Sequence, residues 1–201
     1  MMARRSTLQL MLVAAGISFP AEAVTAQIGA PVDIVEALTC KISAPAYVGF
    51  AMNLGDVDAG YRLLGWTMQP SGTAFLSQYH LPRPIVVAGH RTSTIVFSGS
   101  GVAAVLDEAD PASVAAPLGV VNRLMSREAA AAALGLTPVQ AAQLPAVTSF
   151  RGGRVMLDTT GENAGARMRL RTRIVQPVTN DAARPGKTVL GCSYSIDVLD
   201  D

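Results

Sequence analysis

The chain has 201 residues, of which half are hydrophobic and 15% are charged, and its formal net charge is +1. Without the leader described next, which carries Arg4, Arg5 and Glu22, 14 basic and 14 acidic side chains remain and the net charge is zero. A neutral chain is poorly suited to non-specific binding of polyanions. The remaining length, about 175 residues, suits one domain with a sizeable core.

The first residues have the composition of a secretory signal peptide. Arg4 and Arg5 form a positive start, residues 8–17 form an apolar run too short to span a bilayer, and Pro20 ends that run. The arginine pair also suggests the twin-arginine route. Thr7 stands where that signal usually has a large apolar residue, so the general secretory route is favoured.

Two cleavage sites follow the apolar run, after Ala23 and after Ala26. We therefore predict that residues 1–26 are a cleaved signal peptide and residues 27–201 a single exported β-rich domain. The expected location is periplasmic or secreted. No transmembrane segment is expected after signal removal, because no later apolar run reaches about 18 residues.

The only two cysteines are Cys40 and Cys192. An even number of cysteines in an exported protein indicates a disulfide, which here would join the start of the mature domain to its last strand. A catalytic thiol or a metal ligand is the alternative, but the chain has no C-x-x-C pair. We predict a structural disulfide.

The first half of the mature chain is predicted to be a short helix followed by an antiparallel meander. Asp33 can cap a helix that ends at Leu38. Four glycines leave residues 45–66 ambiguous. Pro82 and Pro84 should end the first strand, since proline cannot donate to a central ladder. The expected strands are 73–81, 85–88, 94–97 and 102–106.

A helical insert is predicted around residues 112–144. Ser126 is a good N-cap, and Thr137 forms a capping box with Gln140. We expect the alanine-rich face of this insert to cover one side of the sheet. The run from Glu128 to Gln140 is similar to a helix-turn-helix unit. Its second helix is short and the leader directs the chain away from DNA, so we predict no nucleic-acid partner.

The chain then returns to strands with clean alternation. Residues 154–159 and 167–176 are predicted to form a hairpin with Asp158 opposite Arg169, and residues 189–198 form the last strand. The predicted fold is therefore α+β and mainly antiparallel β, either a sandwich or a strongly curved sheet, with the helical insert around residues 112–144.

The sharpest local feature is a row of four arginines on one face of a predicted strand: Arg167, Arg169, Arg171 and Arg173. One interpretation is a binding surface for an anionic envelope component or an acidic envelope protein, because arginine matches carboxylate and phosphate geometry. The other is a solvated face of an outer strand, paired across the sheet with acidic residues.

No catalytic set stands out in the sequence. His80 and His90, the only histidines, match no metal-ligand spacing. The run Ser98-Gly99-Ser100-Gly101 departs from the G-x-S-x-G nucleophile pattern, because Ser98 stands where the first glycine should be. We therefore predict no catalytic residue, no metal and no cofactor.

The function predicted from sequence is a non-catalytic binding or accessory protein of a Gram-negative cell envelope, whose partner the sequence does not identify. Two alternatives remain open. One is a small periplasmic hydrolase built from Ser, Asp and His80 or His90. The other is a carrier of an apolar ligand, because the mature chain is rich in Ala, Val, Leu and Met.

Overall fold

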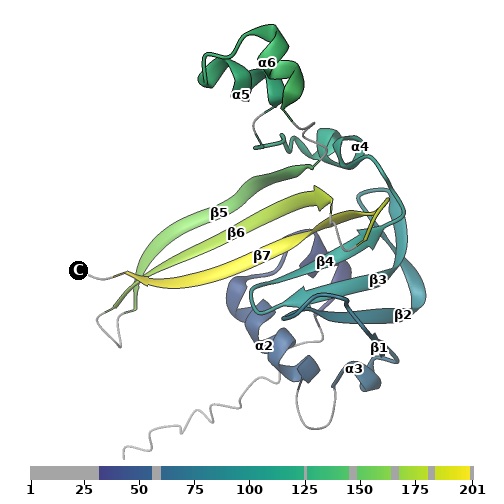
Figure 1. The fold of residues 1–201 in the computed structure, drawn as a ribbon. Coiled ribbons are helices and arrows are strands. Elements are labelled where there is room, and N and C mark those ends of the chain that lie inside the picture. The colour runs from purple at the N-terminus through teal and green to yellow at the C-terminus, as the bar shows by residue number, and fades with distance from the viewer. Residues whose placement is uncertain are drawn as a thin grey trace, which may run out of the picture.

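The fold is a single antiparallel sheet of seven strands in the order β1-β2-β3-β4-β7-β6-β5 (Figure 1). The computed structural model describes residues 32–55, 60–124, 126–144, 149–163, 168–180 and 184–199. This confirms the predicted α+β, mainly antiparallel fold, and the sheet is one strongly curved layer rather than two stacked ones. The strands are β1 (Thr67–Gln69), β2 (Ser77–Val87), β3 (His90–Ser98), β4 (Gly101–Leu106), β5 (Arg151–Asn163), β6 (Met168–Asn180) and β7 (Thr188–Leu199).

Helices from the N-terminal part cover one face of this sheet, called here the inner face. Asp33 accepts a hydrogen bond from the Val35 amide (2.7 Å), which confirms the predicted cap. Tyr47 stacks on Tyr194 with ring centroids 4.5 Å apart, so aromatic rings join helix and sheet. The helices are α1 (Ile34–Leu38), α2 (Ala44–Gly55) and α3 (Gly60–Leu63); α2 and α3 occupy most of the ambiguous glycine-containing region.

The predicted disulfide between Cys40 and Cys192 is present, with the two Cα atoms 5.3 Å apart. It fixes the end of α1 against the middle of β7. Next to it the Tyr194 hydroxyl donates to the Ala37 carbonyl at 2.6 Å. Burial raises the pKa of Tyr194, which keeps this hydroxyl protonated as a donor. Covalent and hydrogen bonds thus hold the N-terminal helix on the sheet.

The two prolines of β2 do not end the strand, so the prediction of two separate strands is wrong. Pairing with β3 shifts between His80, which faces Thr94, and Ile85, which faces Thr92. On the other side of β2, the pairing with β1 ends at His80, which lies opposite Thr67, the first residue of β1. Residues 81–84 therefore lie at a sheet edge in an irregular register, where a missing proline N–H removes no ladder bond.

The hairpin of β5 and β6 forms, but its register differs from the predicted one. Asp158 lies opposite Arg173, not opposite Arg169, and Glu162 is the residue that faces Arg169. An irregularity at Met156 shifts the pairing by one residue on β5. β5 also extends to Asn163, four residues beyond the predicted end of that strand.

The helical insert is present; its first part packs into the core and its last two helices do not. Val114 and Ala115 are buried in the core. The last two helices pack on each other and stand away from the sheet (Figure 1). Ala131, the buried residue of α5, lies beside α6 and not on the sheet. The expectation that this alanine-rich face covers the sheet is therefore wrong. The insert comprises α4 (Pro111–Ala115), η1 (Ala116–Leu118), α5 (Arg127–Ala133) and α6 (Pro138–Gln143).

Candidate ligand groove on the outer face of the sheet

The outer face of the sheet, opposite α1 and α2, carries a row of small side chains in its middle. Val102 and Cys192 point into the core, so their neighbours Ala103 and Gly191 belong to the outer face. Ala103 lies opposite both Gly191 and Val96. The row continues to Pro177 and Gly153, which are paired with each other. A hollow forms because these residues fill little space.

Two glycines of the outer face, Gly101 and Gly191, are required by the close approach of β4 and β7. A Cβ atom on Gly191 would lie 2.1 Å from the Val102 carbonyl oxygen and 2.6 Å from Ala103 Cβ. A Cβ atom on Gly101 would lie 2.8 Å from the Cys192 carbonyl oxygen. Backbone packing therefore leaves no room for a side chain at Gly101 or Gly191.

Two arginines stand at opposite ends of the groove. Arg184, in the β6–β7 connection, donates to the Ser71 carbonyl oxygen (2.9 Å) and to Gln78 Oε1 (3.0 Å). Arg151 begins β5, and its amide donates to Asn122 Oδ1 (3.0 Å). The cavity between them has a volume of about 450 Å³. Its described lining is Leu76, Val96, Ser98, Gly101, Val102, Ala103, Arg151, Pro177, Thr179, Asn180, Arg184, Val189, Cys192 and Ser193.

The groove combines an apolar floor with a positive rim. Val96, Ala103 and Pro177 give it apolar atoms, and no acidic residue occurs among its described lining residues. Arg184 is already held by hydrogen bonds. The exposed guanidinium of Arg151 has no partner in the described part of the chain. Pockets of about 300–1,000 Å³ with mostly apolar walls and a few polar groups are typical ligand sites.

The residues considered for catalysis are not assembled there. Ser98 and Ser193 line the groove, but both histidines lie outside its described lining. His80 faces Thr94, four residues from His90 along β3, which separates the two histidine positions by about 13 Å at strand spacing. The Ser98 hydroxyl donates to the Gly101 carbonyl oxygen (3.3 Å), as a turn residue does.

The described residues lack both the side-chain cluster of a metal centre and a long apolar helix. These residues contain no group of three His, Cys, Asp or Glu side chains arranged to hold a metal ion. Among the same residues, no helix has both the length and the apolar character needed to cross a membrane.

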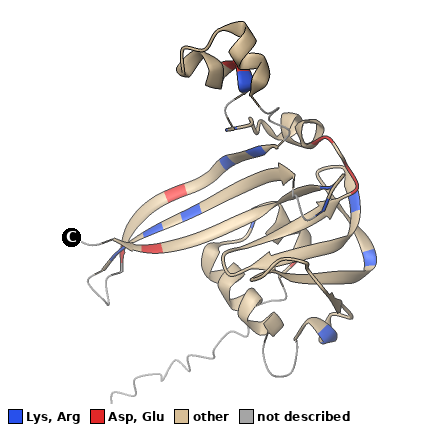
Figure 2. Ribbon diagram, viewed as in Figure 1, with Lys and Arg blue, Asp and Glu red and all other residues tan. Residues whose placement is uncertain are grey.

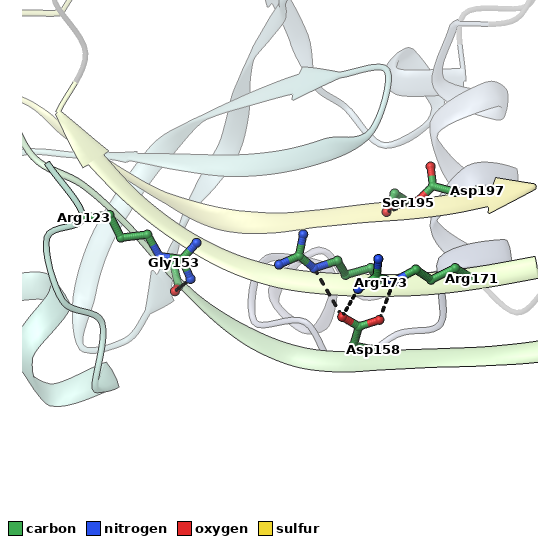
Figure 3. Close-up of polar contacts among 7 residues, drawn as sticks. All are labelled: Arg123, Gly153, Asp158, Arg171, Arg173, Ser195 and Asp197. Carbon is green, nitrogen blue, oxygen red and sulfur yellow. Dashed lines mark hydrogen bonds and ion pairs between the residues drawn. The ribbon is translucent and has the colours of Figure 1, made fainter. Parts of the chain in front are cut away.

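The predicted arginine row lies on β6, away from the groove, with acidic residues on the strands beside it (Figure 2). Arg171 binds both carboxylate oxygens of Asp158 at 2.7 Å (Figure 3). These hydrogen bonds hold the pKa of the Asp158 carboxyl below its usual range. Arg173 Nε lies 3.7 Å from the same carboxylate. Arg167 lies outside the described residues.

The charges of this face balance in the described part of the chain. Glu162 faces Arg169 across β5 and β6, and Asp197 faces Arg171 across β6 and β7. With Asp158, each described arginine of the row thus has an acidic residue at or beside its register position. Anion binding by Arg169, Arg171 and Arg173 stays a prediction, and an anion would have to compete with these carboxylates.

Sequence reasoning did not identify the groove, although part of its signal was visible. The alternation of the last strand places Gly191 and Ser193 on the polar face, two small residues in succession. That pattern indicates that side chains fill little space on the outer face of this strand. It does not show that Ala103, Pro177 and Gly153 continue the row, because these residues come from three other strands.

No family model, curated protein or solved structure matches the chain.

Proposed function

We propose that the chain is an exported, non-catalytic binding protein of the cell envelope, and that the outer groove between Arg184 and Arg151 is its ligand site. The observation that carries the proposal is the groove itself, a cavity of about 450 Å³ with an apolar floor and two arginines at its ends. Its floor is set by backbone packing at Gly101 and Gly191, so it needs no rearrangement to open.

The two other functions considered differ in their support. A carrier of an apolar ligand agrees with the apolar floor at Val96, Ala103 and Pro177, and the proposal adopts that part of it. A serine hydrolase would need a base within hydrogen-bond reach of its nucleophile. Ser98 and Ser193 have no histidine beside them in the described lining. The export part of the proposal rests on the leader and on the disulfide.

The test is mass spectrometry of the protein purified from a periplasmic fraction. The denatured mass should correspond to cleavage after Ala23 or Ala26 and to one intact disulfide. The native spectrum should contain an additional bound small molecule. Ala103→Leu fills the floor of the groove and should abolish that species, whereas Ala46→Leu, the same change at an exposed position of α2, should preserve it.

A second variant that fills the groove distinguishes loss of the site from misfolding of a single variant. Ser193→Leu places a large side chain beside the same floor, and circular dichroism should show that both groove variants keep the strand signal. Covalent labelling of Ser98 or Ser193 by a broad serine-hydrolase probe would contradict the proposal and favour the enzyme. Equal ligand occupancy in Ala103→Leu and Ala46→Leu would remove the groove as the site.

A further inference from the structure

We infer that the groove takes a single-chain amphiphile with one anionic head group, bound with the head at Arg151 and the apolar chain across Ala103 toward Val96. This inference rests on the proposed function and names its ligand class. It follows from the direction of the groove, from the difference between the two arginines and from the chemistry of the floor.

The groove runs across the strands rather than along them. Val96 lies on β3 and Pro177 on β6, with β4 and β7 between them. Three strand spacings separate these two residues by about 14 Å. The outer-face row between them contains only Ala103 and Gly191, so an unbranched chain can lie flat there. A bulky or globular ligand would leave this length unused.

The two ends of the groove differ in what they offer a ligand. At the β2 end Arg184 is held by Ser71 and Gln78 at 2.9 and 3.0 Å, so its donors already have acceptors. At the β5 end the guanidinium of Arg151 is exposed, and no described residue pairs with it. An arginine without a partner binds a carboxylate or phosphate through two parallel hydrogen bonds.

Hydrogen bonds hold the backbone at the Arg151 end, which fixes the point from which that side chain extends. Asn180 Oδ1 accepts the Phe150 amide (2.6 Å), and Thr179 donates to the Phe150 carbonyl oxygen (2.9 Å). The Arg151 amide is bonded to Asn122 Oδ1 (3.0 Å). The start of β5 is thus fixed from two sides. The arginine that would meet the ligand's head group thus extends from a fixed point at the end of the groove.

The experiment measures binding of decanoate and of decanol to the disulfide-bonded mature protein by titration calorimetry at pH 7.5. Decanoate should bind, and Arg151→Gln should weaken it roughly tenfold or more, as expected for a charge-assisted hydrogen bond. Decanol should bind Arg151→Gln and the unmodified protein equally. Arg83→Gln removes an equal charge from an exposed edge position outside the groove and should leave decanoate binding unchanged.

Decyl phosphate separates the two kinds of anionic head group. Tighter binding of the phosphate than of decanoate assigns the head as a phosphate ester, and the reverse assigns it as a carboxylate; loss of both in Arg151→Gln supports the inference. Equal losses in Arg151→Gln and Arg83→Gln would overturn it, as would decanoate binding that survives Ala103→Leu. If a ligand co-purifies but neither anionic amphiphile binds, the proposed function stands and this inference fails.

Discussion

The two halves of β7 have the same alternating sequence but opposite surroundings. Leu190, Cys192 and Tyr194 are at most 2% exposed, whereas Ile196 and Val198, on the same face, are 41% and 58% exposed. The first three lie under the helices, in what we call the body. The last two lie in what we call the arm, residues 156–163, 168–173 and 195–199, where β5, β6 and β7 run beyond the helices (Figure 1).

The difference teaches that alternation specifies which face is apolar but not whether anything covers it. In the body, the disulfide and the Tyr194 hydrogen bond hold α1 on the inner face. In the arm, the strands are held by their backbone ladders and by cross-strand pairs on the charged face. Of these pairs, Asp158 with Arg171 has the best hydrogen-bond geometry. The two regions should therefore respond to different substitutions.

The largest expected effect is loss of the disulfide. The double substitution Cys40→Ser and Cys192→Ser opens a loop of 152 residues and should lower the free energy of unfolding by about 2–5 kcal/mol. Denaturant titration of oxidised and variant protein measures this loss. Hydrogen exchange should show that amides of α1 and of the first half of β7 lose most protection. An unchanged denaturation midpoint would contradict the view that the body depends on this link.

The second effect compares two truncations on one face of β7. Leu190→Ala creates a cavity in the covered half and should cost about 2–5 kcal/mol. Val198→Ala removes atoms that are already half exposed, so its cost should stay below about 1 kcal/mol. Denaturant titration measures both. Equal costs would mean that the inner face of the arm is covered in solution, and sedimentation would then show whether a second copy covers it.

The elements that carry a local sequence signal are the part of the molecule that sequence predicted well. Local signals specify their own elements: Asp33, Ser126 and Thr137 cap the helices that they precede. The cysteine pair gave the disulfide because exported chains use even numbers of cysteines in that way. The prediction that Pro82 and Pro84 end the strand is wrong because proline costs a ladder hydrogen bond only where a neighbouring strand is paired. The local sequence does not show whether such a strand is present.

The groove and the arm could not be predicted, because both depend on relations between distant strands. The floor joins Ala103 to Gly191 and to Pro177, residues brought together only by the strand order. The charge balance of the arm depends on the register of β5 and β6, which shifts at Met156. A one-residue irregularity changes every pair beyond it. Sequence patterns therefore described the strands individually better than their assembly.

The smallest expected effect concerns the charged face of the arm. Because hydrogen bonds from Arg171 lower the pKa of Asp158, its ionised form is favoured in the folded state. The stabilisation is therefore present above the unfolded-state pKa of about 3.9 and is lost as pH falls through the lower folded-state pKa. Carbon NMR titration of the Asp158 carboxyl should give a pKa below the ordinary value, and Arg171→Gln should move it back toward that value.

Arg169→Gln is the matched control, because Arg169 lies on the same face of β6 and no ion pair joins it to Asp158 in the described structure. It should shift the Asp158 titration less than Arg171→Gln does. Acid should also increase amide exchange in the arm before it does so in the body, since the disulfide that holds the body together does not depend on an ionised carboxylate. Simultaneous exposure of both regions would show that the arm depends on the covered half for its order, and that the carboxylate does not set its acid limit.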